Sequence, residues 1–199
     1  MDLRAIEKNY DRMSDSKLIE VITTNAHGIQ PEVFGIIENE IRKRNLDPNL
    51  LNAVIAQNEH HSLEDIYRHS ELLRDLPCPI CDNSRDKLNG TVCYTIKSII
   101  ITTFTATKIV IACPDCLDKQ NRKAITSCSL LGWWGIPFGI LKTPVYIYRN
   151  LKAKDENRTS DSNGALLSFT AEHIGQIKAF ENNPEKLKNL IRDMKYLGF

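Results

Sequence analysis

Two Cys-Pro-x-Cys pairs constrain this chain more than any other feature of its sequence. Cys78 and Cys81 form the first pair, and Cys113 and Cys116 form the second, with 31 residues between the pairs. A two-residue gap lets both sulfurs of a tight turn face one ion, and two such turns complete a tetrahedral set of thiolates. The sequence therefore predicts a structural zinc (Zn2+) site, because four cysteines leave no position for a catalytic water.

Other uses of such cysteines stay open at the level of sequence. An iron–sulfur cluster uses the same four thiolates, whereas a redox Cys-x-x-Cys motif needs a thioredoxin-like setting that tandem pairs do not offer. His60, His61 and His69 lie close to the first pair in the sequence. Because four cysteines already complete a tetrahedral site, we expect these histidines at the protein surface.

The chain holds two further cysteines, and its first residues do not resemble a secretory signal. Cys93 and Cys128 lie outside the pairs in apolar surroundings, and we expect both to be buried free thiols. Residues 1–10 mix acids and bases and lack the apolar stretch of a signal peptide. Because zinc thiolates must stay reduced, we expect a cytoplasmic protein, peripheral on the inner face of the cell membrane.

Charge is balanced over the whole chain but not along it. The 199 residues carry 26 Lys+Arg against 25 Asp+Glu, and 42% of them are hydrophobic. These values exclude a generally polybasic nucleic-acid binder and a wholly disordered chain. Residues 1–76 carry 9 bases and 14 acids, whereas residues 77–123 carry 7 bases and 4 acids. An acidic head is thus joined to a basic cysteine region.

We predict an α+β protein with five segments. A small acidic helical module comes first, followed by a zinc-ribbon-like domain, an apolar Trp/Gly/Pro segment, a linker and C-terminal amphipathic helices. Their expected bounds are, in the same order, 1–76, 77–123, 124–152, 153–164 and 165–199. The linker is expected to be a flexible surface loop, and the last segment is expected to form helices over 165–180 and 184–196.

Capping signals and apolar periodicity predict the helices of the first segment. Ser14 is placed to cap one helix, and Pro31 and Pro48 each stand where a first-turn proline opens another. Ser62 followed by Asp65 resembles a capping box with Asp in place of Glu. The resulting three or four short helices present an acidic surface that a protein partner can bind.

The residues between the cysteine pairs favour strands. From Thr91 to Ala112, 14 of 22 residues are Ile, Val or Thr, a composition typical of β-structure. We predict strands over Thr91–Phe104 and Lys108–Ala112, with a turn near Thr105–Thr107. This hairpin brings the two cysteine pairs together, and it is too small to be stable without the metal.

An uncharged stretch follows the second cysteine pair. Residues 124–141 hold no charge, and glycines and prolines interrupt the sequence GWWGIPFG within it. Adjacent tryptophans favour a membrane–water interface, and flanking cations favour anionic headgroups. Two interpretations stay open: insertion into the cytoplasmic membrane surface, or a tight turn whose tryptophans pack on the sheet. The residues predicted to contact a membrane or a partner are Trp133, Trp134, Ile136, Phe138, Lys123, Lys142 and Arg149.

Residues 78–150 resemble a group of poorly characterised bacterial zinc-ribbon proteins. The matching features are two Cys-Pro-x-Cys knuckles, an apolar run from Gly132 to Pro137 with Gly139, and a helix that ends at Asn150. The group is similar, more distantly, to LITAF-like domains, in which a pair of zinc knuckles anchors a monotopic membrane segment. Here Ile111 stands where the LITAF-like pattern has a histidine, and the apolar segment follows the second knuckle. The resemblance implies structural zinc and membrane association, and it implies no catalytic residue.

Three kinds of function follow from these features. We expect a non-enzymatic, zinc-stabilised module that associates with the cytoplasmic membrane surface or with a membrane protein. A nucleic-acid-binding zinc ribbon and a soluble protein–protein adaptor that uses the N-terminal helices are the alternatives. Nucleic-acid binding would use Lys97, Lys108, Lys119, Arg122, Lys123 and Tyr94. We expect no enzyme, because the sequence holds no nucleophile elbow, P-loop, HExxH or paired-carboxylate motif in a suitable context.

Overall fold

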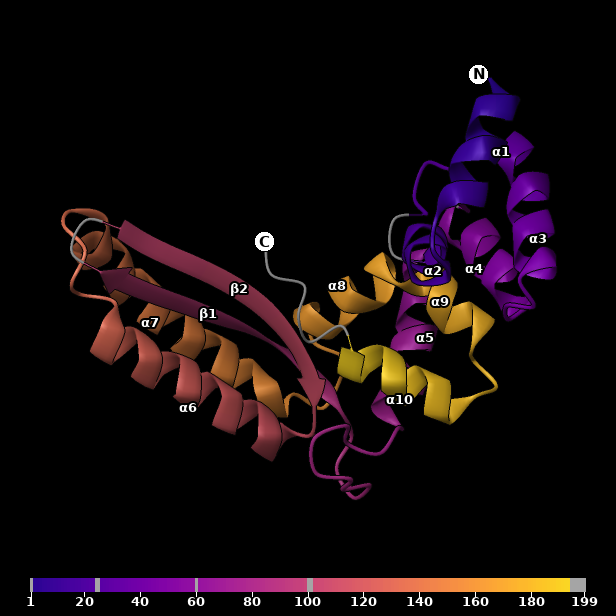
Figure 1. Cartoon of the computed structure of the whole chain (residues 1–199). Helices are drawn as coiled ribbons and strands as arrows, with labels where there is room; N and C mark the ends of the chain where they lie inside the picture. Colours follow the sequence, from indigo (N-terminus) through magenta and orange to yellow (C-terminus); the bar gives the residue numbers. More distant parts are fainter. Residues whose placement is uncertain (1, 24–25, 60, 100–101, 194–199) are drawn as a thin grey trace. The chain divides into compact units, whose positions relative to one another are not determined.

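The computed structural model describes residues 2–23, 26–59, 61–99 and 102–193 (Figure 1). The chain divides into two compact units, each formed from two separate stretches of sequence. The N-terminal unit comprises Met1–His69 and Thr170–Pro184, and the C-terminal unit comprises Ser70–Phe169 and Glu185–Phe199. Helices and an antiparallel sheet are both present, which confirms the predicted α+β class.

Helices build the N-terminal unit, and their apolar faces meet in one core. The helix α5 (Leu63–Arg74) begins in this unit and ends in the other, whereas α8 (Gly164–Glu172) runs from the C-terminal unit into this one. Leu18, Ile22 and Ile37 are fully buried at the centre of the core. The remaining helical elements are α1 (Leu3–Arg12), α2 (Asp15–Thr23), the 3-10 turn η1 (Pro31–Val33), α3 (Phe34–Lys43), α4 (Asn49–Gln57) and α9 (Ile174–Ala179).

The predicted helix starts in this unit are confirmed. The Ser14 hydroxyl accepts a hydrogen bond of 3.3 Å from the backbone N–H three residues later, and the Ser62 hydroxyl accepts one of 3.1 Å from Asp65. Pro31 opens a helical segment whose first turn is 3-10, and Pro48 directly precedes α4. Each serine satisfies one of the backbone donors that the first helical turn leaves free.

A C-terminal segment completes this unit, although not as one helix. The helix predicted over 165–180 is wrong in its extent, because it is broken at His173 into α8 and α9. At Gly175, an added Cβ would meet the backbone of α4 at 2.2 Å, so only glycine allows this close packing. The Gln57 side chain accepts a hydrogen bond from the Gly175 N–H (3.1 Å) and donates one to the Glu172 carbonyl oxygen (3.0 Å).

The histidines near the first cysteine pair are not all at the surface, so this prediction is wrong. His69 is fully buried, and its Nδ1 lies 2.7 Å from the Asp65 carbonyl oxygen. His61 contacts the Asp65 carboxylate at 3.1 Å, and His60 lies outside the described residues. Burial raises the pKa of Asp65, but hydrogen bonds from Lys178 and neighbouring cations outweigh it and hold that pKa well below its usual range. His61 and His69 therefore belong to a structural cluster around Asp65.

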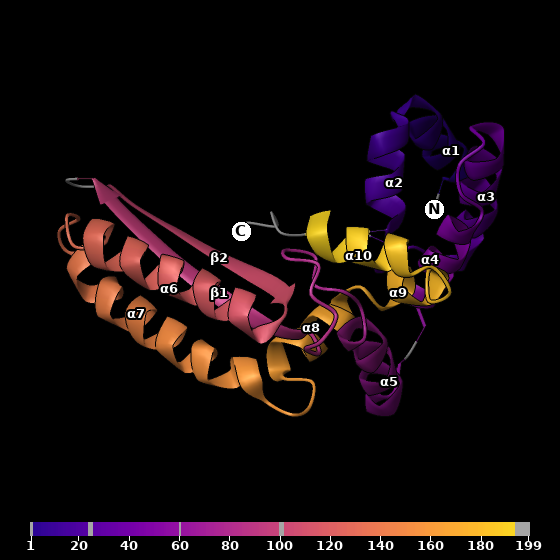
Figure 2. The same cartoon turned by 90° about the horizontal axis from the view of Figure 1, so that it is seen from below.

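A hairpin and two long helices form the greater part of the C-terminal unit. The strand β1 (Asn89–Ile99) pairs antiparallel with β2 (Thr102–Ala112), and α6 (Pro114–Leu131) and α7 (Phe138–Asp155) follow in the chain. Figure 1 and Figure 2 both show α6 and α7 side by side along the hairpin, with β1 packed against both helices. We call these four elements the hairpin arm.

The register of the hairpin corrects the predicted turn. Residues 105–107 lie within β2, where Thr105 pairs with Ile96, and the chain reverses between Ile99 and Thr102. The β-branched threonines favour an extended backbone through 105–107, and no Gly, Asn or Pro is present there to favour a turn. Because Asn89 pairs with Ala112, the two chain segments that carry the cysteine pairs leave the sheet side by side.

Polar side chains attach α6 and α7 to β1. Asn150 is fully buried, and its Oδ1 accepts a hydrogen bond from the Tyr94 N–H (3.0 Å) while its Nδ2 donates to the Tyr94 carbonyl oxygen (2.7 Å). These two bonds take the place of a neighbouring strand, so α7 seals the outer edge of β1. On α6, the side-chain oxygen of Asn121 accepts a hydrogen bond from the Thr91 hydroxyl (3.0 Å).

The segment 153–164, predicted to be a flexible surface loop, is partly helical and partly buried. The helix α7 continues to Asp155, and the 3-10 turn η2 (Glu156–Arg158) follows it. The Asn157 Nδ2 donates to the Asp118 carboxylate (2.9 Å), and the Asn163 Nδ2 donates to the Gly90 carbonyl oxygen (2.6 Å). Small polar residues that are typical of a loop here satisfy buried acceptors of the arm.

Candidate metal centre

The first cysteine pair lies in a tight loop between α5 and β1. The Cys78 N–H donates to the Asn83 carbonyl oxygen, and the Asp82 N–H donates to the Cys78 carbonyl oxygen, both at 2.9 Å. Asp82 has a φ of 58°, a left-handed conformation that Asp adopts more readily than most residues. The loop is thereby closed on itself around Cys81.

Arg74, at the end of α5, anchors this loop to the start of β1. Its carbonyl oxygen accepts a hydrogen bond from the Leu88 N–H (2.9 Å), and its Nε donates to the Leu88 carbonyl oxygen (3.2 Å). A second guanidinium nitrogen donates to the Ser160 carbonyl oxygen (2.6 Å), and a third lies 2.9 Å from Glu71. One buried side chain thus links the helix, the cysteine loop and the segment after α7.

The second cysteine pair begins α6. Cys113 is the N-cap residue, and Pro114 takes the first helical position, where the missing N–H of proline costs little. Cys116 follows in the first turn of the helix. The N-terminus of a helix favours negative charge, so this position offsets part of the cost of ionising both thiols.

The structure brings the four predicted ligands together. The sulfur atoms of Cys78, Cys81, Cys113 and Cys116 all lie within 4.8 Å of one another, and those of Cys81 and Cys113 are 3.6 Å apart. A tetrahedral zinc ion with Zn–S bonds of about 2.3 Å separates its ligand sulfurs by about 3.8 Å. Four cysteines therefore lie close enough to hold one metal ion, and the Cys81–Cys113 separation is near that of a tetrahedral thiolate site.

Burial opposes ionisation of the inner thiols. It raises the pKa of Cys113 to about 11 and also raises the pKa of Cys116. Cys81 is exposed, and a hydrogen bond from the Asn83 backbone N–H lowers its pKa. A bound cation supplies the positive charge that lets all four thiols ionise together, so metal binding releases protons.

The two remaining cysteines are buried free thiols, as predicted. Cys128 is fully buried, and its Sγ donates to the Tyr94 carbonyl oxygen at 3.4 Å. Burial raises the pKa of Cys93 to about 11. Because the thiolate is the reactive and metal-binding form, neither side chain is suited to redox chemistry or to ligation.

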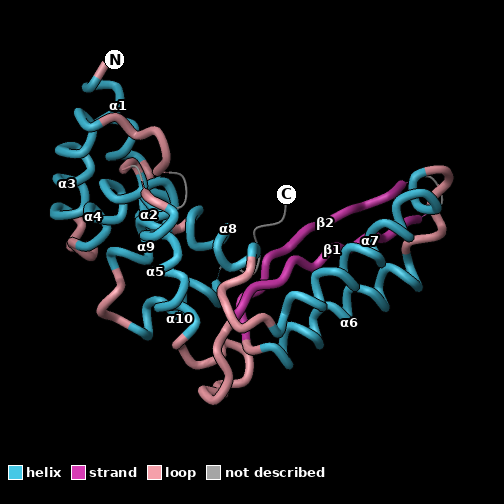
Figure 3. The backbone as a smooth tube through the Cα atoms, turned by 180° about the vertical axis from the view of Figure 1, so that it is seen from behind, coloured by secondary structure: helices cyan, strands magenta, loops and turns pink. Residues whose placement is uncertain are grey.

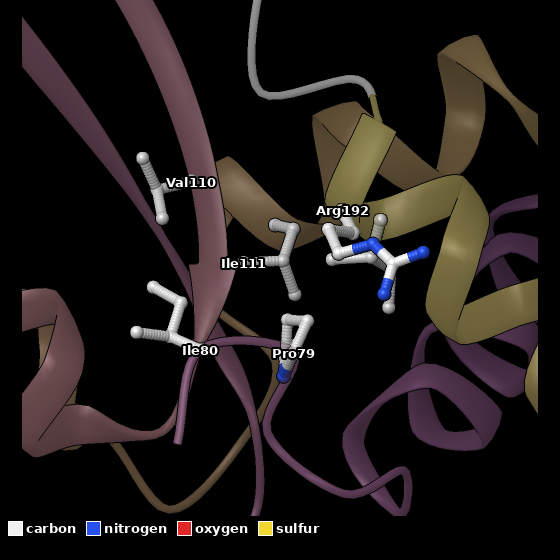
Figure 4. Close-up of a pocket in the computed structure, with 6 residues that line it drawn as sticks. Pro79, Ile80, Val110, Ile111 and Arg192 are labelled. Atoms are coloured by element: carbon white, nitrogen blue, oxygen red, sulfur yellow. The ribbon is translucent and has the colours of Figure 1, made fainter. Parts of the chain in front are cut away.

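Within the C-terminal unit, the helix α10 (Pro184–Asp193) packs over the first cysteine loop. Its start confirms the predicted helix from residue 184, whereas the predicted end at 196 lies outside the described residues. Figure 4 shows Pro79 and Ile80 of the loop near Ile111 of β2. These side chains and Ile191 of α10 line a cavity of about 10 Å³, which has room for about one water molecule. Such a cavity is too small for a substrate. Through these contacts, α10 covers the loop.

A salt bridge joins α10 to the first cysteine loop. The Lys188 Nζ lies 2.5 Å from the Asp82 carboxylate and holds the pKa of that carboxyl below its usual range. The carboxylate is mostly exposed, so the pair contributes little to stability by itself. Its position matters more, because it joins α10 to the residue that closes the cysteine loop.

The predicted contact residues at the turn between α6 and α7 are exposed. The exposed fractions are 42% for Trp133, 68% for Trp134, 72% for Ile136 and 58% for Phe138. Each indole N–H donates to the carbonyl oxygen four residues earlier, at 2.9 and 3.0 Å. The indole donors are therefore satisfied while much of each ring faces outward. We call these four residues the apolar tip.

The turn that carries the apolar tip rests on the end of the hairpin. Figure 3 shows the loop between α6 and α7 beside the ends of the strands. A Cβ on Gly135 would meet the Thr103 Oγ1 at 2.4 Å, so glycine is required for this approach. Ile99 and Phe104 of the strands are exposed at the same end, at 65% and 60%. The exposure of these two residues is not predictable from the sequence, because apolar residues in strands usually face a core.

The three cations predicted at this site are all exposed, but they are not all near the tip. The Lys142 Nζ lies 5.6 Å from the centre of the Phe138 ring, one helical turn away. Arg149 follows Phe138 by about 16 Å along α7, and Lys123 lies on α6. The structure thus places Lys142 beside the apolar tip and Arg149 farther along the arm.

Tyr94, the aromatic residue considered for base stacking, is engaged within the arm. The Arg149 guanidinium lies 5.4 Å from the centre of its ring, and the Tyr146 ring meets it edge-on at 5.9 Å. Stacking of a nucleobase needs an open ring face. The packing around Tyr94 therefore gives no support to nucleic-acid binding through this residue.

The tip does not belong to a membrane-spanning helix of the described structure. Within residues 2–23, 26–59, 61–99 and 102–193, no helix combines the length and the apolar character needed to cross a membrane.

Comparison with protein-family models, with curated proteins and with solved structures finds no match to this chain.

Proposed function

We propose that this protein is a non-enzymatic, zinc-stabilised module that attaches to the cytoplasmic face of a membrane, or to a protein in it, through the apolar tip. The observation that carries the proposal is the exposure of four large apolar side chains on one short turn. Exposed apolar clusters mark surfaces that bind a partner or a membrane. The resemblance to bacterial zinc-ribbon proteins with a Trp-containing apolar segment supports the same proposal.

A structural zinc ion suits this role. Four cysteines occupy all positions of a tetrahedral ion, so no position remains for a substrate or a catalytic water. The ion would join the loop before β1 to the start of α6, which are the two ends of the hairpin. It would thereby hold the base of the arm while the tip lies at the other end of the strands.

The tip is sufficient for reversible attachment. Burial of a large apolar side chain contributes about 1.5–3 kcal/mol, and the tip has four such side chains. Tryptophan is favoured at the level of lipid headgroups, and Lys142 beside the tip adds attraction to anionic lipids. Association through the tip requires no spanning helix.

Liposome flotation tests this function. The full chain is mixed with vesicles of phosphatidylglycerol and phosphatidylcholine, and we expect it to float with them. The double variant Trp133→Ser/Trp134→Ser should remain at the bottom of the gradient. Leu63→Ser is the matched control, because Leu63 is also an exposed apolar residue but lies in α5. A wild-type protein that does not float, or a double variant that floats equally well, contradicts membrane attachment through the tip.

A further inference from the structure

The helix α7 has an inverted distribution of polarity. Its buried residues are Gly139, Thr143 and Asn150, whereas Leu141 and Tyr148 are both 66% exposed. A surface helix of a water-soluble protein places apolar side chains inward and polar ones outward. Small and polar residues at helix contacts, with apolar residues facing out, are typical of helices surrounded by lipid. The outer face of α7 therefore combines exposed apolar side chains with the exposed cations Lys142, Arg149 and Lys152, which fits the boundary between lipid tails and headgroups.

This exposed apolar face extends along most of the helix and is not confined to the tip. Phe138, Leu141, Val145 and Tyr148 follow one another at intervals of three or four residues, and Leu151 continues the exposed surface. From the first to the last of them the helix rises about 20 Å. An arm that enters a membrane end-on would bury only the first of these residues. Burial of the whole face requires the helix to lie parallel to the membrane surface.

The charges along α7 favour a bilayer over a second copy of the chain as the occupant of this face. Lys142, Arg149 and Lys152 are exposed on the helix, and residues 124–154 contain no Asp or Glu. Two copies packed face to face would bring these like charges together, which is unfavourable. Anionic lipid headgroups complement the same charges, and each cation near the surface strengthens binding about fivefold.

A hollow lies where the cations of α7 meet β1. Tyr94, Arg149, Lys152 and Glu156 are among the residues that line it, and its volume is about 470 Å³. The Arg149 guanidinium stacks over the Tyr94 ring at 5.4 Å, which fixes one cation at the wall of the hollow. An Arg and a Lys on one wall form a binding site for a phosphate group. Glu156 is the acidic group at this site and opposes such a ligand.

We infer that α7 lies in the plane of an anionic membrane surface and that the hollow beside Tyr94 receives the phosphate of a lipid headgroup. This inference rests on the proposed membrane attachment and adds to it an orientation and a ligand. The apolar tip is then one end of a longer contact surface. Tyr148 lies on the exposed apolar face that the membrane would bury. Arg149 is adjacent to it, at the level of the headgroups.

The orientation is tested with tryptophan fluorescence. Trp133 and Trp134 are the only tryptophans of the chain, so wild-type emission reports the tip. The variant Trp133→Phe/Trp134→Phe/Tyr148→Trp moves the reporter to the middle of α7. On phosphatidylglycerol vesicles with brominated acyl chains, we expect a blue shift and quenching for both proteins.

The outcomes separate the inference from the proposed function. Wild-type emission that vesicles do not change contradicts membrane attachment itself. Quenching of the wild type without quenching at position 148 overturns only the in-plane orientation, because the tip then enters alone. A reporter at 148 that becomes shielded with rising protein concentration and without vesicles shows that a second copy covers the face, and this also overturns the inference.

The hollow is tested by removal of its charges. We expect Arg149→Gln/Lys152→Gln to bind phosphatidylglycerol vesicles about thirtyfold more weakly, since each cation contributes about fivefold. The matched control Arg4→Gln/Lys8→Gln removes the same charge from exposed positions of α1. Glu156→Gln should strengthen binding, because it removes the acid that opposes the phosphate. Equal weakening in the two double variants, or no gain from Glu156→Gln, overturns the assignment of the hollow.

Inorganic phosphate distinguishes a lipid headgroup from a free anion as the ligand. At constant ionic strength and millimolar concentration, we expect phosphate to leave the protein on the vesicles. Release of the protein by phosphate, with direct phosphate binding that Arg149→Gln/Lys152→Gln abolishes, would assign the hollow to a soluble anion and overturn the lipid assignment.

Discussion

The two units of this protein differ in how they place their apolar side chains. In the N-terminal unit, Leu18, Ile22 and Ile37 are fully buried in a helical core. In the hairpin arm, Asn121 and Asn150 are fully buried, as are Ile96 and Leu117, while other large aliphatic and aromatic side chains of α6 and α7 face outward. The first unit is completed by its own core, whereas the second leaves its most apolar surface uncovered.

Because of this difference, the two units are stabilised by different interactions. A buried hydrogen bond contributes about 1 kcal/mol net, so polar contacts such as those of Asn150 give less than an apolar core of the same size. The metal ligands lie at the base of the arm, where binding of an ion adds folding free energy directly. The arm thus exposes apolar surface, while buried aliphatic side chains, hydrogen bonds and, in the proposed metal-bound form, the ion would maintain its fold.

The largest expected effect is the loss of the metal. Cys113→Ser should remove the ion and about 10 kcal/mol of folding free energy from the C-terminal unit. Hydrogen exchange should then show lost protection over residues 77–123 and unchanged protection in α2 and α3. Cys93→Ala is the control, because Cys93 lies outside the cluster. One metal ion per chain in the Cys113→Ser protein would contradict the four-cysteine site.

Truncation of apolar side chains should have opposite consequences in the two units. Ile37→Ala creates a cavity in the N-terminal core and should cost about 2–5 kcal/mol in the free energy of unfolding of that unit. Leu141→Ala removes an exposed side chain and should change stability by less than about 0.5 kcal/mol in water. Urea titration followed by hydrogen exchange measures both. A large loss of stability from Leu141→Ala would contradict the inverted polarity of α7.

Removal of a buried amide should destabilise the arm. Asn150→Ala leaves the Tyr94 N–H without its side-chain partner and leaves the Tyr94 carbonyl oxygen with only the weak Cys128 thiol donor, which should cost about 1–3 kcal/mol. The measurement is the urea midpoint of the C-terminal unit, with Asn189→Ala on the exposed side of α10 as the control. Equal effects of the two changes would show that Asn150 does not seal the strand edge.

The last expected effect is a pH dependence of the N-terminal unit. Burial lowers the pKa of His173 from its ordinary value of 6.5 to about 4. Between these values the unfolded chain binds a proton that the folded chain excludes, so stability falls as the pH falls from about 6.5 toward 4. We expect a loss of about 2 kcal/mol from pH 7 to pH 5, measured by urea unfolding. His173→Gln should flatten this slope, whereas His27→Gln at an exposed position should retain it.

Sequence patterns that depend on neighbouring residues predicted much of the fold. The caps at Ser14 and Ser62 depend on contacts over three residues, and they are confirmed. The four ligands were predictable because two short turns with fixed spacing determine where their sulfurs point. The hairpin turn was misplaced because the threonines of β2 favour strand throughout, and no residue marks the reversal.

Long-range contacts account for what the sequence did not reveal. The buried position of Asn157 depends on partners far away in the chain, because its side chain donates to Asp118 and Asn121. The outward face of α7 was also missed, because its pattern of apolar residues does not say which side packs on β1. Only the placement of Asn150 against the strand determines that side.

The sheet of the arm has one covered edge, along β1, and one open edge, along β2. Asn150 occupies the outer N–H and carbonyl groups of Tyr94, and in the described part of the chain no strand pairs with the other edge, along β2. Tyr94 lies opposite Thr107, so the alternation of an antiparallel pair directs the Thr107 N–H and carbonyl groups away from β1. Each molecule therefore offers a single edge to an added strand. Strand pairing through this edge would join no more than two copies of the chain, because both edges of the joined sheet would then be covered. Growth into a fibril through these edges would stop at that point.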